Sequence, residues 1–320
     1  MTAKARRLTV LLVIAAGMVL LPRPLAGALE IPQVASWISL SNLGVLVATY
    51  RLGWRWGLAS ALTLTGLITL AVLTKGQPPT AIPLMAISAL ALGLTARWEI
   101  QSLLVLLMVT QCFVVVESPV PAHPAAVLAF AGLLVLLTTA TATATAGAER
   151  LGGWRPPPTE VHHSWERSLA YGLLLGSTMA ITSAIALQGH WGLMGGWLML
   201  TPLMVMRPYA RDSWPRSLHR ALGTLLGVGL VHLFALAAPW PPALPVGAVA
   251  FSTVTVLAAL KHWHHMLYVA FLSAAVILFN SSETSVLALA QERLEANLLG
   301  IAIAMAAMAL AQAGLRQRRL

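Results

Sequence analysis

The chain has 320 residues, of which 58% are hydrophobic and only 9% are charged, and its mean hydropathy is +0.80. A soluble domain carries about 25% charged residues, because its surface faces water. This composition therefore excludes a water-soluble globular fold. The net charge of +10 does not indicate nucleic-acid binding, since the basic residues lie in short clusters between apolar runs of about 20 residues, the length that crosses a bilayer.

Apolar runs bounded by charges or by proline and glycine predict an all-α integral membrane protein with about twelve transmembrane helices. The predicted spans are residues 8–28, 33–49, 54–74, 80–96, 99–117, 124–147, 167–187, 190–206, 214–238, 242–260, 263–280 and 288–315. The first run follows basic residues and ends in small ones, a pattern that also fits a secretory signal peptide. Whether this segment is retained is therefore left open.

Lysine and arginine in the short loops set the orientation, because basic residues resist translocation across the membrane. With the N-terminus inside, every basic residue falls on the cytoplasmic side except Arg23, Lys75 and Arg293. We therefore expect both termini in the cytoplasm, and a multi-pass protein of the bacterial inner (plasma) membrane.

The two halves of the chain resemble each other in register. Arg7 and Arg167 stand 160 residues apart, and so do Trp37 and Trp197. Six spans per half is an even number, so the pattern predicts two parallel six-helix repeats related by an axis along the membrane normal. The predicted division is a first repeat at residues 1–147, a cytoplasmic linker at 148–166 and a second repeat at 167–320.

The densest polar segment of the chain is residues 197–227. A span ends there at Arg207, and a new helix follows a short basic turn. Arg216 and Arg220 lie four residues apart and therefore share one helical face. Arginines around a helix N-terminus favour an anion, because the helix dipole and the guanidinium charges add. The same side chains also fit membrane anchors that touch anionic lipid, or a salt bridge to Asp212.

This segment closely resembles the signature of the fusaric acid resistance (FUSC) or aromatic acid exporter family. The matching positions are Trp197, Thr201, Arg207, Pro208, Arg216, Arg220, Gly223, Thr224 and Gly227. Only the membrane portion is covered, because a linker of about 20 residues stands where full-length members usually carry a large cytoplasmic domain. The resemblance implies export of small aromatic carboxylic or other organic acids, often with a periplasmic adaptor protein, by chains that associate as a homodimer.

The motif suggests two sets of functional residues. The candidates for binding a small organic anion are Arg207, Arg216, Arg220, Trp197 and Thr201. The candidates for helix packing are Gly223, Thr224 and Gly227, because small residues four apart let another helix approach closely.

Ionisable residues within predicted spans are the candidates for coupling transport to a proton gradient. They are Glu292, Arg293 and Glu295 near the outer end of the last span, and His232 in the ninth. The acidic and basic groups also fit a structural ion pair or solvation in the headgroup layer. His232 also fits a neutral imidazole bonded to a neighbouring helix, although a histidine titrates near working pH.

The sequence contains no Walker A motif, dinucleotide-binding glycines, HExxH or GxSxG, and its only cysteine is Cys112. We therefore expect no enzyme, no metal, no cofactor and no nucleic acid, with membrane lipids and a small organic anion as partners. The function predicted is an inner-membrane secondary transporter that exports organic acids. An anion channel, and a non-transporting subunit or lipid-handling component of an efflux assembly, are the alternatives.

Overall fold

The computed structural model describes residues 3–118, 120, 123–152, 160, 162–237, 243–260, 263–280 and 286–317. Throughout these residues the regular structure is helical, and no strand occurs among them. Part of the predicted linker, at residues 153–159 and 161, lies outside the described part of the chain.

A helix coincides with each predicted span, and the first span is divided in two at Pro22, which has no N–H to continue the ladder of α1. The first half contains α1 (Ala3–Leu20), α2 (Pro22–Ala28), η1 (Pro32–Val34), α3 (Ala35–Leu52), α4 (Trp54–Leu73), α5 (Pro78–Leu94), η2 (Thr95–Trp98), α6 (Gln101–Val114) and α7 (Pro124–Gly152). The second half contains α8 (Trp165–Gln188), α9 (Gly192–Val205), α10 (Ala210–Ala237), α11 (Ala243–Leu260), α12 (His265–Asn280) and α13 (Val286–Gln317).

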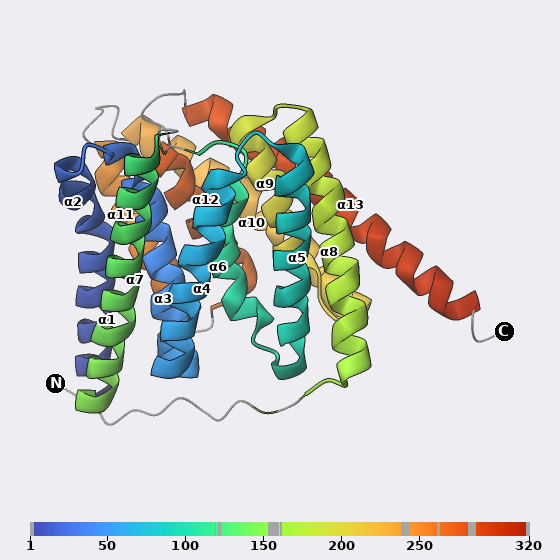
Figure 1. The fold of residues 1–320 in the computed structure, drawn as a ribbon, viewed down its shortest axis with the longest axis horizontal. Coiled ribbons are helices and arrows are strands. Elements are labelled where there is room, and N and C mark those ends of the chain that lie inside the picture. Colours follow the sequence, from blue (N-terminus) through green and yellow to red (C-terminus); the bar gives the residue numbers. More distant parts are fainter. Residues whose placement is uncertain are drawn as a thin grey trace.

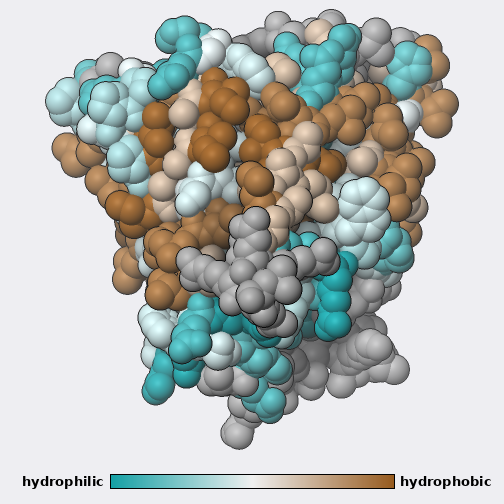
Figure 2. All heavy atoms as spheres, turned by 90° about the vertical axis from the view of Figure 1, so that its right-hand side faces the viewer, coloured by the Kyte–Doolittle hydropathy of each residue, from teal (hydrophilic) through white to brown (hydrophobic). Residues whose placement is uncertain are grey.

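Within the described residues, six helices are long and apolar enough to cross a membrane by length and composition. They are Trp54–Leu73, Pro78–Trp98, Pro124–Ala148, Trp165–Gln188, Arg211–Ala237 and Ala288–Ala313. On the face shown in Figure 2, a broad apolar area lies between hydrophilic side chains above and below it. The fold is thus consistent with a multi-pass helical membrane protein, whereas the number of twelve spans, the parallel repeat and the cytoplasmic termini stay predictions.

Most helices stand side by side along a common direction, and α13 slants across the bundle toward the C-terminus (Figure 1). The lower edge of Figure 1 holds the beginning of α1, the end of α7 and the beginning of α8. The two halves of the chain therefore begin on the same side of the bundle.

One seam between the halves is built from glycine. There α5 packs along α8, and α6 packs along α9. A Cβ placed on Gly93 would lie 2.4 Å from the Cα of Gly172, and one on Gly176 would lie 2.9 Å from the Ala86 carbonyl oxygen. Only glycine permits this approach of α5 and α8, so the seam is tight.

Three aromatic rings meet at the centre of the larger core. Phe113 of α6 lies with its ring centroid 5.2 Å from that of Trp37 in α3 and 4.3 Å from that of Trp197 in α9. All three side chains are buried. The two tryptophans that define the predicted repeat therefore reach the same ring from opposite halves of the chain.

Candidate functional site

The turn between α9 and α10 is shaped by proline and serine. Met206 has the extended ψ of 141°, and Arg207 precedes Pro208, which disfavours helical geometry in the residue before it. The backbone N–H of Arg207 donates to Ser213 Oγ at 2.9 Å. A new helix then begins at Ala210, slightly before the predicted start, and carries Arg216 and Arg220 into the bundle.

Arg207 is buried in this turn, with 9% of its surface exposed. Its Nε has no hydrogen-bond partner among the described residues. Burial, together with the positive charge of Arg216, lowers the pKa of Arg207 to about 10, although Tyr171 and Asp212 act in the opposite direction. The guanidinium still carries its charge at neutral pH.

Arg220 lies one helical turn beyond Arg216, and its side chain is fully buried. None of its three guanidinium nitrogens has a hydrogen-bond partner in the described part of the chain. It lies within electrostatic reach of Tyr268 in α12 and of Arg293 in α13. A buried cation without such partners is expensive in a bilayer.

Arg293 is, after Arg220, the second fully buried cation, with 1% of its surface exposed. Its guanidinium carbon lies 3.7 Å from the ring centroid of Trp197, in cation–π contact. One amino group donates to Ser273 Oγ at 3.1 Å. Its Nε and its other amino group have no partner among the described residues.

Polar side chains join three helices beside these arginines. Thr201 Oγ1 of α9 lies 2.6 Å from Asn297 Oδ1 of α13 and 2.9 Å from the carbonyl oxygen of Trp197. Asn297 Nδ2 donates to Thr224 Oγ1 of α10 at 3.2 Å. Close approach of α13 requires Gly300, where a Cβ would lie 2.6 Å from Thr201 Cβ.

The two glycines of the motif face α12. A Cβ on Gly223 would lie 2.6 Å from the Met266 carbonyl oxygen. A Cβ on Gly227 would lie 2.6 Å both from the Ala270 carbonyl oxygen and from Ser273 Cβ. These contacts hold α12 close enough for Ser273 to reach Arg293.

Residues 180–307 match the family model described as fusaric acid resistance protein-like. This segment is therefore similar to the fusaric acid resistance protein-like family. The match confirms the resemblance predicted from the motif, and it includes α9, α10, α12 and both buried arginines, Arg220 and Arg293. The family indicates membrane transport or efflux in general and is not a family of enzymes. No curated protein and no solved structure matches the chain.

The family segment brings together only some of the residues predicted for the site. Arg293 joins the arginine cluster, but Glu295 is exposed and accepts from Gln291 Nε2 at 2.8 Å. Glu292 is half-buried, and His232 is exposed on the outer face of α10. For Glu292, Arg293 and Glu295, an ion pair or solvation in the headgroup layer was the alternative. Arg293 fits neither, because it is buried between helices.

None of the ion pairs among the described residues joins a buried arginine to a carboxylate. The carboxylate of Asp212 pairs at 3.6 Å with the exposed Arg211, and not with Arg216 or Arg220. The alternative of a salt bridge to Asp212 therefore does not apply to the buried arginine of α10.

Sequence reasoning gave no role to Asn297, Ser273 or Tyr268. One signal for Asn297 was present, because it stands four residues after Arg293 and therefore shares its helical face. Nothing in the sequence places Ser273 or Tyr268 near an arginine, since both lie on a separate helix of almost uniform apolarity.

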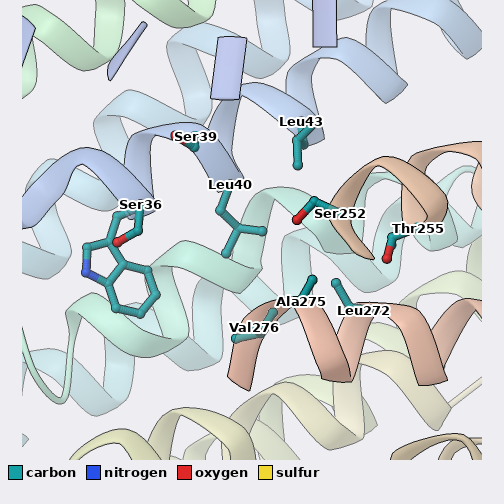
Figure 3. A pocket seen from close by; sticks show the side chains of 10 residues that line it. Ser36, Ser39, Leu40, Leu43, Ser252, Thr255, Leu272, Ala275 and Val276 are labelled. Atoms are coloured by element: carbon teal, nitrogen blue, oxygen red, sulfur yellow. The ribbon is translucent and has the colours of Figure 1, made fainter. Parts of the chain in front are cut away.

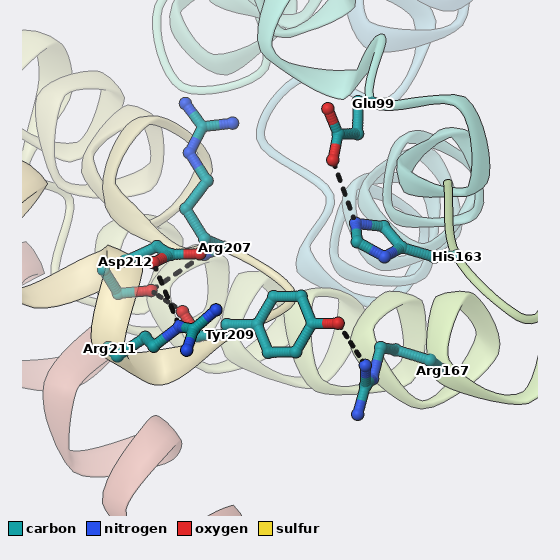
Figure 4. A network of polar contacts seen from close by, with 8 residues as sticks. Glu99, His163, Arg167, Arg207, Tyr209, Arg211 and Asp212 are labelled. Carbon is teal, nitrogen blue, oxygen red and sulfur yellow. Dashed lines mark hydrogen bonds and ion pairs between the residues drawn. The ribbon is translucent and has the colours of Figure 1, made fainter. Parts of the chain in front are cut away.

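A polar network ties the family segment to the first half at the lower side of Figure 1 (Figure 4). His163 Nε2 lies 3.6 Å from Glu99 Oε1, and its ring centroid lies 5.5 Å from that of Tyr209. Arg167 donates to the Tyr209 hydroxyl. In Figure 4 the Arg207 guanidinium points away from this network, so it stays free of these contacts.

Proposed function

We propose that the chain is a secondary transporter of the bacterial inner membrane that exports small organic acids, aromatic carboxylates in particular. The single observation that carries the proposal is the pair of buried cations, Arg220 and Arg293, without a carboxylate partner among the described residues. An ionisable group at membrane depth is by default a functional-site candidate.

An anion supplied from outside the chain fits this pair of charges. A carboxylate has two oxygens that can each accept a hydrogen bond from a guanidinium, and such bonds are shorter and stronger than neutral ones. The unpartnered nitrogens of Arg220 and Arg293 offer these donors. Binding would therefore satisfy donors that are otherwise left in an apolar interior.

The surroundings of Arg293 favour an aromatic acid. The guanidinium lies against the face of Trp197 at 3.7 Å, and an aromatic ring of a ligand can stack beside such a pair. The neighbouring Thr201 and Asn297 supply neutral polar groups that can orient a ligand. This arrangement supports an anionic head with an aromatic body.

A series of cations leads toward the pair from the turn that bears Arg207. Arg216 lies one turn before Arg220 on α10, and its charge acts on Arg207. On the predicted orientation this turn is cytoplasmic, so the series supports uptake of the anion from the cytoplasm. A homodimer and a periplasmic adaptor belong to the same proposal.

Transport by inverted membrane vesicles tests the proposal. With a pH gradient imposed, vesicles that contain the protein should take up at least one acid from a panel of aromatic carboxylates. Arg220→Gln should lower this uptake by roughly tenfold to a hundredfold, because a charge-assisted hydrogen bond contributes about 1.5–3 kcal/mol. Arg211→Gln, which changes an exposed arginine of the same helix, is the control and should transport normally.

Two outcomes contradict a carrier. Uptake of none of the acids by vesicles with folded protein rejects organic-acid export. Single-channel currents carried by the same anions in planar bilayers would instead assign an anion channel, since the series of cations along α10 also suits a conducting path.

A further inference from the structure

A crevice separates the two halves of the chain on the side away from the glycine seam. Two partly open cavities form it, with volumes of about 50 and about 20 Å³. Leu43 and Ser252 line both cavities, so the two cavities lie side by side. The crevice therefore extends along α11, between that helix and α1, α3 and α12.

The wall of the crevice is apolar and uncharged. Figure 3 shows Leu40 and Leu43 of α3 facing Ser252 of α11 and Leu272 and Ala275 of α12. Among the described residues, none of those that line the two cavities is charged. Such a surface favours hydrocarbon over any ion.

The hydroxyl groups in the wall do not change this character. Ser39 Oγ donates to the Ala35 carbonyl at 2.8 Å, Thr255 Oγ1 to the Phe251 carbonyl at 2.8 Å, and Thr253 Oγ1 to the Val249 carbonyl at 2.9 Å. These protons are used within their own helices. These three hydroxyls therefore offer little to a charged ligand, and their methyl and methylene groups remain to contact an apolar one.

The crevice lies at the height where hydrocarbon is expected. Its walls come from the middle of α11, at residues 249–255, and from the middle of α12, at residues 272–276. We propose that it binds one acyl chain of a membrane phospholipid. An uncharged wall at the middle of these helices matches an acyl chain whose headgroup stays at the membrane surface.

The arrangement disfavours the other occupants. An aromatic carboxylate is too short to keep its charge at the membrane surface and would bring it to a wall without a cation. The anion site lies across α12, because Ser273 of the same helix turns to Arg293 while Leu272 and Ala275 turn to the crevice. The proposal is thus independent of organic-acid transport and holds even if no acid is exported.

Saturable photolabelling tests the lipid site. The full chain, purified in a delipidating detergent, is mixed with a phosphatidylglycerol that carries a photoreactive diazirine in one acyl chain, and is irradiated with and without excess unlabelled phosphatidylglycerol. We expect labelling that saturates at one lipid per chain, is lost with the competitor, and maps by mass spectrometry to α3, α11 and α12.

A matched pair of variants locates the site. Ala275→Trp fills the crevice and should abolish the saturable labelling. Ala250→Trp makes the same change on the exposed face of α11 and should retain it. If Ala275→Trp does not fold, Ser252→Leu serves as the smaller filling variant, and monodisperse elution is required of each protein.

Several results would overturn the proposal. They are labelling that does not saturate, labelling confined to the outer faces of the helices, or equal labelling of the filled and control variants. Competition by benzoate but not by the phospholipid would assign the crevice to an acid instead. Cross-linked dimers that involve α11 would assign it to a second copy of the chain.

Discussion

Arg293 shows how a cation is accommodated inside an apolar bundle. The face of Trp197 at 3.7 Å and the hydroxyl of Ser273 at 3.1 Å satisfy part of its guanidinium, while two of its nitrogens remain without partners among the described residues. A buried charge is most costly when it is uncompensated. The chain can therefore fold with Arg293 buried, and a bound anion would still stabilise the two nitrogens that lack partners.

A carboxylate built into the chain should compete with that anion. Asn297 stands one turn from Arg293 on α13, and both of its hydroxyl neighbours, Thr201 and Thr224, can donate to a carboxylate. Asn297→Asp should therefore raise the unfolding temperature of the anion-free protein and weaken anion binding at least about tenfold. Calorimetry of the purified variants measures both quantities.

The control for this change is Asn297→Leu, which removes the hydrogen bonds without adding charge and should lower the unfolding temperature. An unchanged anion affinity in Asn297→Asp would show that the anion binds away from Arg293.

The packing of α10 against its neighbours depends on the side of the helix on which each of its glycines lies. Gly227 meets the backbone and Ser273 of α12, whereas no atom would lie within 4 Å of a Cβ on Gly229. We predict that Gly227→Ala lowers the free energy of unfolding by about 1–3 kcal/mol through overpacking. Gly229→Ala should raise it by roughly 0.5–1 kcal/mol, because alanine loses less backbone entropy in a helix.

Thermal unfolding in detergent distinguishes the two variants, and the wild type provides the reference. Equal effects of the two substitutions would contradict the close contact of α10 with α12. Because Ser273 contacts Arg293, Gly227→Ala should also weaken anion binding, whereas Gly229→Ala should not.

The positions of the helices could be predicted from the sequence for a physical reason. The same reason does not predict which side of each helix is buried. Backbone polar groups must bond internally in lipid, so long apolar runs form helices, and every predicted span coincides with one. Lipid-facing and interior residues are both apolar in such helices, so no amphipathic pattern reveals which side is buried. This is why His232 and Glu295 were candidates although both are exposed.

The contacts that make the site are tertiary and were not predictable. Trp197 and Arg220 followed from the motif, but the contact of Trp197 with Arg293 joins residues 96 positions apart. The glycine contact between Gly300 and Thr201 is equally remote in sequence. Family resemblance supplied the arginines of α10, and only the packing of α9, α10, α12 and α13 brings them to Arg293.

The orientation of the whole molecule can be tested with thiol labelling. Cys112 is fully buried, and Cys112→Ala gives a background without thiols. Gln77→Cys and Glu160→Cys then place single thiols at exposed positions on the predicted outer and cytoplasmic sides. An impermeant maleimide added to intact cells should label position 77, and should label position 160 only after permeabilisation; the reverse pattern would invert the orientation.

At the same scale, the two halves of the chain meet in a tight glycine seam and also line a partly open crevice. Trp37 and Trp197 contact the common ring of Phe113, and Ser41 and Thr201 both lie within hydrogen-bond distance of the carbonyl of the tryptophan four residues earlier. These correspondences support two related halves. Among the described residues the buried arginines lie in the second half alone, so the proposed anion site has no counterpart in the described part of the first half.

Binding of a matched acid and amide tests the central claim most directly. Benzoate and benzamide share a ring and differ in charge, and calorimetry of the purified protein can compare their affinities. We predict that benzoate binds, that benzamide does not bind measurably, and that Arg293→Gln abolishes the binding of benzoate while the protein stays folded. Equal binding of both compounds, or benzoate binding that survives in both Arg220→Gln and Arg293→Gln, would contradict an anion site built on the two buried arginines.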